Sequence, residues 1–143
     1  MIKTKETDKL KTFASFACIG SWVLYFISVI SVVIFLRKSG VDWPSATFIP
    51  LAGGSVALLS SKLFLFNLFE SKNLKTREIV YPIFKYTFLI VGLGSTLACL
   101  YYYSKKDYMN AVRLISFGEL LIAAFLSSVG YEIKNKLFLN KKL

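Results

Sequence analysis

The sequence contains no histidine, and this absence excludes several functions. Haem ligation by histidine, most zinc sites and the usual general base all require an imidazole. Intramembrane proteolysis by a serine–histidine pair is excluded for the same reason. The apolar segments also contain no paired carboxylates that could support an aspartyl mechanism. We therefore expect a noncatalytic protein that uses neither a metal nor a cofactor.

Cysteine is also scarce, with two residues in the whole chain, Cys18 and Cys99. In the helices predicted below, the two cysteines lie near opposite ends, so that their depths differ by roughly 15 Å or more. A disulfide requires Cα atoms within about 7 Å of each other. Both cysteines are therefore predicted to be packing residues.

Charged residues are rare over most of the chain, which instead carries four long apolar stretches. A hydrocarbon core about 30 Å thick is crossed by roughly 20 helical residues, and each stretch meets that length. None alternates with the period of two that a membrane barrel needs. We predict an all-α, polytopic membrane protein with a single four-helix transmembrane domain over residues 1–143. The predicted helices cover residues 12–36, 46–69, 81–103 and 108–130, followed by a basic tail over 131–143.

The first apolar stretch differs from a secretory signal peptide. It is too long for a signal-peptide core, and its small residues lie near its start, whereas a cleavage site would follow the apolar core. We expect this segment to be retained as a membrane helix.

The distribution of cations predicts the orientation in the membrane, because short loops rich in Lys and Arg remain in the cytoplasm. With four crossings, the two tails and the central loop share one side. That side carries eleven cations, whereas the opposite loops carry four. We therefore expect a multi-pass protein of the bacterial inner membrane with cytoplasmic N and C termini.

The cytoplasmic face carries eleven cations and five acids, a net charge of +6. Anionic lipids of the inner leaflet are the expected partners of such a face. A cytoplasmic protein partner is also expected, whereas direct nucleic-acid binding is not, because the cations are spread over two tails and a loop and no aromatic-interleaved groove accompanies them. The candidate partner- or lipid-binding residues are Lys72, Lys75, Arg77, Lys134, Lys136, Lys141 and Lys142.

Small residues at intervals of three or four mark the expected contacts between helices, because lipid gives helices little hydrophobic reason to associate. They occur in every predicted helix, in some on more than one side. This pattern suits both contacts within the chain and contacts between protomers, and we predict a homo-oligomer. The predicted packing residues include Gly53, Gly54, Ala57, Gly94, Ala98, Ala124 and Ser128.

Ionisable residues within the apolar stretches are candidate functional residues, because placing a charge in lipid is costly. Lys62, Lys85 and Arg113 lie close enough to a helix end to extend toward water. Glu119 is about 15 Å from either surface and must be neutral, paired or exposed to internal water. Arg113 and Lys62 are candidate ion-pair partners, and a hydroxyl bonded to a protonated carboxyl is the alternative.

The layout of the chain is that of a short, histidine-free, four-helix membrane protein with basic cytoplasmic ends. This layout resembles the membrane subunits of bacterial anti-phage systems, such as the Kiwa membrane protein KwaA. The resemblance implies a membrane subunit that acts beside a cytoplasmic effector. Small multidrug exporters also have four helices, but their essential carboxylate lies in the first helix, which here has no acidic residue between positions 12 and 36.

These features predict a sensor or scaffold subunit for antiviral defence that oligomerises and recruits a cytoplasmic partner. A second hypothesis is a pore or ion-conducting protein, such as a holin or a depolarising effector, with Glu119 and helix serines along its path. A bacteriocin immunity protein is a third possibility with the same layout.

Overall fold

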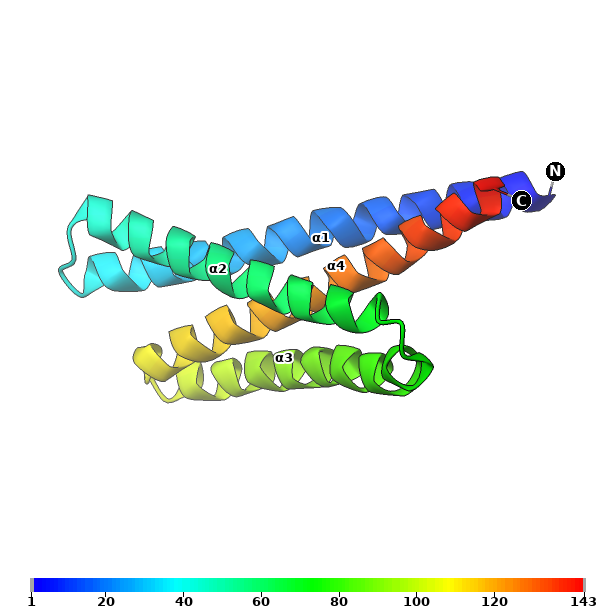
Figure 1. The fold of residues 1–143 in the computed structure, drawn as a ribbon. Coiled ribbons are helices and arrows are strands. Elements are labelled where there is room, and N and C mark those ends of the chain that lie inside the picture. The colour runs from blue at the N-terminus through cyan, green and yellow to red at the C-terminus, as the bar shows by residue number, and fades with distance from the viewer. Residues whose placement is uncertain (1, 143) are drawn as a thin grey trace.

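The computed structural model describes the backbone of residues 2–142 and the side chains of residues 5–138. The described chain is helical, and four of its helices are long and apolar enough to span a membrane. The elements are α1 (Ile2–Lys38), α2 (Trp43–Phe69), the short π-helix η1 (Thr76–Val80), α3 (Tyr81–Ser104) and α4 (Tyr108–Lys142), shown in Figure 1. The predicted all-helical, four-span architecture is therefore confirmed.

The bundle has two distinct ends. Both chain ends and the connection between α2 and α3 lie at one end, which we call the terminal end (Figure 1). The loops that join α1 to α2 and α3 to α4 lie at the other, the hairpin end. This arrangement follows from four successive antiparallel crossings.

Two helices extend beyond the predicted membrane crossings. α1 already begins at Ile2 instead of near residue 12, and α4 continues to Lys142, past the end of the crossing predicted over residues 108–130. Over its 37 residues, α1 is about 55 Å long, far more than the roughly 30 Å of a hydrocarbon core. The polar flanking segments are therefore helical extensions of the apolar crossings.

The hairpin end has two short loops. α1 ends at Lys38 and α2 already begins at Trp43, with a proline in its first turn. Gly40, with a φ of +93°, provides the positive φ that this turn requires. α3 and α4 form a tight hairpin, since α3 ends at Ser104 and α4 begins at Tyr108.

The central helix of the bundle is α4, which packs against each of the other three long helices. It runs from α3 at the hairpin end to α1 at the terminal end, where α1 and α4 lie side by side (Figure 1). Ala123 and Ala124 of α4, together with Ser128, are completely buried at these contacts. The predicted packing role of Ala124 and Ser128 agrees with this arrangement.

Two glycines allow α3 and α4 to approach backbone to backbone. A Cβ atom added to Gly92 would lie 2.9 Å from the Gly118 carbonyl oxygen, and one added to Gly118 would lie 2.8 Å from that of Gly92. Real Cβ atoms do not come so close to backbone atoms, so both positions require glycine at this separation. Gly54 makes a looser contact with Tyr25 of α1.

Other small residues predicted as packing positions face outward. Gly53 and Gly94 have no neighbouring atom within 4 Å of an added Cβ, and Ala57 is exposed. Ala98 is half-buried. Gly53, Ala57 and Gly94 therefore do not lie at the helix contacts within the bundle, because the helices are rotated to bring other small residues inward. These positions remain available for contact between copies.

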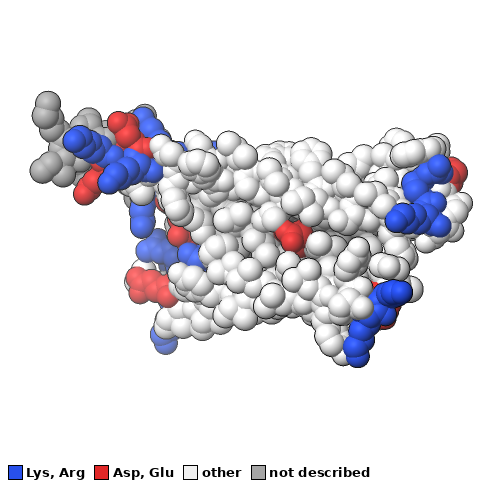
Figure 2. Space-filling model, turned by 180° about the vertical axis from the view of Figure 1, so that it is seen from behind, with Lys and Arg blue, Asp and Glu red and all other residues white. Residues whose placement is uncertain are grey.

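The exterior of the bundle is strongly apolar. Large side chains such as Phe16, Phe48 and Ile90 are about 70% exposed. Figure 2 shows a belt that is uncharged except for an acidic patch near its middle, between two ends that carry the basic groups and the other acidic groups. A belt of this kind is the surface expected of a bundle whose solvent is lipid.

Candidate functional site

Glu119 is the only acidic residue in the sequence of the four predicted apolar stretches, and it lies half-way along the stretch 108–130, about a third of the way along α4. It is 7% exposed, and the Thr96 hydroxyl of α3 donates a hydrogen bond of 3.4 Å to its Oε1 atom. The same hydroxyl lies 3.0 Å from the Gly92 carbonyl oxygen, to which its single proton can be donated instead. Because a hydroxyl both donates and accepts, this position offers a partner to the carboxylate and to the protonated carboxyl alike.

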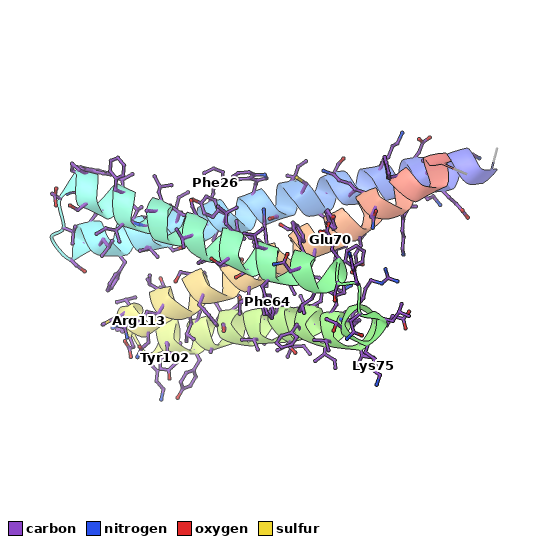
Figure 3. The ribbon with its side chains drawn as sticks, viewed as in Figure 1. Phe26, Phe64, Glu70, Lys75, Tyr102 and Arg113 are labelled. Carbon is purple, nitrogen blue, oxygen red and sulfur yellow. The ribbon has the colours of Figure 1, made fainter. Side chains whose placement is uncertain are left out.

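Neither candidate cation forms an ion pair with Glu119 among the described side chains. Arg113 is exposed and lies at the hairpin end with Tyr102 (Figure 3). The Lys62 ammonium lies 5.9 Å from the centre of the Trp22 ring, toward the other end of the bundle. The predicted pairing with Arg113 or Lys62 was therefore wrong, and the hydroxyl alternative describes the geometry.

An ion pair does occur inside the terminal end, between residues that the sequence did not associate. The Lys85 ammonium of α3 donates to both carboxylate oxygens of Glu132 on α4, at 3.0 and 3.3 Å. The side chains are 11% and 22% exposed. Lys85 was predicted to extend toward water, but it is buried and pairs with Glu132, because α4 continues as a helix and brings Glu132 to the depth of Lys85.

Aromatic rings surround this ion pair and connect three helices. The Lys85 ammonium lies 5.5 Å from the centre of the Tyr81 ring and 5.0 Å from that of Tyr86. Tyr81 packs on Phe69 of α2, with ring centres 5.1 Å apart. Rings at these distances provide a favourable environment for a partly desolvated ammonium. The group therefore fastens α2, α3 and α4 together at the terminal end.

A second polar contact at the terminal end joins α4 to the end of α2. The Tyr131 hydroxyl donates to the Glu70 carboxylate, and the Tyr131 ring stacks on Phe66 with centres 4.6 Å apart. Glu70 directly follows the last residue of α2. This contact fixes the point at which the chain leaves α2 for the connection to α3.

Hydroxyl groups connect α1 to its neighbours along one face. Ser21 shares a hydrogen bond of 2.7 Å with Ser127 of α4, and Tyr25 shares one of the same length with Ser55 of α2. Ser28 donates to the Ser116 carbonyl at 3.1 Å. The three α1 residues follow the helical repeat, so this polar face could have been recognised in the sequence. Its position indicates a packing role.

The predicted partner-binding cations gather at the terminal end. Lys72, Lys75 and Arg77 lie on the connection from α2 to α3, and Figure 3 shows Lys75 there with Glu70. Lys134 and Lys136 are exposed on the last part of α4. The other two predicted cations, Lys141 and Lys142, lie outside the residues whose side chains are described. The structure thus gathers cations from two separate segments at one end.

Within the described residues, no group of three or more His, Cys, Asp or Glu side chains is placed to hold a metal ion. Cys18 is exposed and Cys99 is buried, and neither forms a disulfide. The chain matches no protein-family model, and it has no significant match among curated proteins or solved structures.

Proposed function

We propose that this protein is a noncatalytic subunit of the bacterial inner membrane that recruits a cytoplasmic protein to its basic terminal end. The observation that supports this function is the joint extension of α1 and α4 beyond the length of a membrane crossing. These extensions lie side by side, so they offer a helical pair rather than two separate tails (Figure 1).

The helical pair is suited to binding an acidic partner. Among its described residues, exposed Lys5, Lys9, Lys134 and Lys136 supply positive charge. A surface that is already ordered loses less conformational entropy on binding than a disordered tail. The connection cations Lys72, Lys75 and Arg77 lie at the same end and extend this surface. Anionic lipids of the inner leaflet would attract the same cations and hold this end against the membrane.

Assembly of several copies is part of the proposal. The outward-facing small residues Gly53, Ala57 and Gly94 would allow close approach of a second bundle in lipid. Several copies would present several basic ends to the cytoplasm and increase the avidity for a partner. By its resemblance in layout to Kiwa-type membrane subunits, we place the protein in antiviral defence, as a sensor or scaffold.

Purification from its own host at native expression tests this function. The tagged protein is extracted in a mild detergent, the mass of the complex is determined, and the components are identified by mass spectrometry. We expect a stoichiometric cytoplasmic protein that is lost when Lys72, Lys75 and Arg77 are changed to Gln. Changing Lys105 and Lys106 at the hairpin end to Gln is the matched control and should retain the partner.

Recovery of a homo-oligomer alone would contradict recruitment and would favour the second candidate, an ion-conducting protein. The observation that favours conduction is the buried contact between Glu119 and Thr96 at mid-depth. A membrane-potential dye distinguishes the two functions. Depolarisation on expression that disappears in the Glu119→Gln variant would support conduction, whereas the recruiting subunit leaves the dye signal unchanged.

A further inference from the structure

A groove runs along the terminal half of the bundle. A cavity of about 250 Å³ is lined by α1, α2 and α4, and an adjoining cavity of about 500 Å³ lies between α1 and α4. The two share Ala14, Cys18 and Lys134 in their walls. We call this continuous feature the basic groove, because Lys11, Lys62 and Lys134 all line it.

The three lysines come from three different helices, and no acidic residue is among the described residues that line the groove. None of the three forms an ion pair within the described part of the chain, where the ion pair is that of Lys85 with Glu132. Lys62 lies within the apolar span of α2, seven residues before its end, or about 10 Å along the helix. The groove therefore collects positive charge without a counter-charge.

Apart from the lysines, the wall of the groove is mainly apolar. Trp22 and Phe66 line the deeper part, while Ile19 and Leu137 line the part between α1 and α4. Ile19 is 61% exposed and Trp22 is 53% exposed, so the apolar wall continues onto the lipid-facing surface. Hydroxyls of Ser21 and Ser127 are also present at the wall.

These properties identify the kind of molecule that the groove would accept. A soluble anion would be bound by the lysines but would leave the apolar wall uncovered. A neutral lipid would cover the wall but leave the lysines without a counter-charge. A lipid with an anionic phosphate headgroup matches both parts, and basic pockets between membrane helices bind such headgroups.

We propose that the basic groove binds an anionic glycerophospholipid, with its phosphate between Lys62 and Lys134 and an acyl chain along Trp22 and Ile19. Lys11 adds positive charge farther along the groove. Such a lipid would bridge α1, α2 and α4 at the end where these helices leave the membrane. The site shares Lys134 with the surface proposed to recruit a protein, whereas Lys62 and Trp22 belong to the groove alone.

Trp22 provides a reporter inside the groove, and the only other tryptophan is Trp43 at the hairpin end. The full-length Trp43→Phe variant, which retains Trp22, is reconstituted in nanodiscs of phosphatidylcholine with increasing phosphatidylglycerol. One lipid or the other carries brominated acyl chains, which quench nearby tryptophan. We expect brominated phosphatidylglycerol to occupy the groove about thirtyfold more readily than phosphatidylcholine. This factor corresponds to two lysines that each favour the anionic lipid by about 1 kcal/mol.

Three variants make the test specific. In Lys62→Gln with Lys134→Gln, we expect the preference to fall to nearly one. Lys105→Gln with Lys106→Gln is the matched control and should keep it. The Trp22→Phe variant reports from Trp43 and should show no preference. If the double variant does not fold, as judged by helix content from circular dichroism, exposed Lys134→Gln alone should lower the preference by about fivefold.

Three results would overturn the proposal. The first is quenching of Trp22 by the two brominated lipids in proportion to their mole fractions. The second is an unchanged preference for phosphatidylglycerol in the double lysine variant. The third is loss of the preference when inorganic phosphate is added, since that would make the groove a site for a soluble anion.

Discussion

Lys85 of α3 and Glu132 of α4, 47 residues apart in sequence, form an ion pair of 3.0 Å within the terminal end of the bundle. Each group of the pair supplies the counter-charge that the other needs at a position partly removed from water. It is surrounded by Tyr81 and Tyr86, which limit the access of water. A pair in this environment should be sensitive to the loss of either member.

We expect Lys85→Met to destabilise the protein by about 1–3 kcal/mol, because Glu132 is then left partly buried without its counter-charge. Glu132→Gln should cost less, since the amide oxygen still accepts a hydrogen bond from the lysine. Both losses of stability are measured by titrating the protein with SDS in a mild detergent and monitoring its helix content by circular dichroism. The double variant Lys85→Met with Glu132→Gln should be more stable than Lys85→Met alone, because a neutral amide without a partner costs less than a carboxylate. Additive effects of the two single changes would show that the pair does not couple α3 to α4.

Gly92 and Gly94 lie two positions apart on α3, but replacing each of them by alanine should affect the stability of the bundle differently. An added Cβ at Gly92 would lie 2.6 Å from Ile122 Cγ1, so Gly92→Ala should destabilise the bundle by about 1–3 kcal/mol. Gly94→Ala meets nothing within 4 Å and should leave the stability equal or slightly higher. The same SDS titration provides the comparison. Equal effects of the two substitutions would contradict the rotation of α3 seen here.

Glu119→Gln should fold and assemble as the unaltered protein does, because an amide fills the same space and still accepts from the Thr96 hydroxyl. Under the proposed function, this variant also keeps its partner. Size-exclusion chromatography and recovery of the partner check both statements. Thr96→Ser, which retains the hydroxyl, is a suitable control. A loss of function without a loss of assembly would show that the charge or proton of Glu119 is used.

The orientation can be tested with single cysteines in a background of Cys18→Ala and Cys99→Ala. Ser104→Cys lies at the hairpin end and Ser71→Cys on the connection at the terminal end. Because cations favour the cytoplasmic side, a membrane-impermeant maleimide should label Ser104→Cys in intact spheroplasts and Ser71→Cys only after lysis. The reverse pattern would place the termini outside and remove the basis for recruiting a cytoplasmic partner.

The sequence by itself determined the architecture, because the length and apolarity of the four stretches are local properties. A run of some twenty apolar residues must satisfy its own backbone hydrogen bonds in lipid, and a helix does so within one segment. The tight hairpin before Tyr108 and the common end of the termini follow from loop length and from the even number of crossings. The sequence also identified Glu119 as the acid most deeply placed in the apolar region, by its distance from the helix ends.

The tertiary structure decided how each helix is rotated and therefore which side chains meet. Helices that are apolar on all sides carry little information about which face turns inward, since lipid and protein interior are equally apolar. For this reason Gly92 and not Gly94 makes the close contact with α4, and Thr96 and not a cation meets Glu119. The pairing of Lys85 with Glu132 depended on helix length as well, because α4 continues past the membrane boundary that its composition suggested.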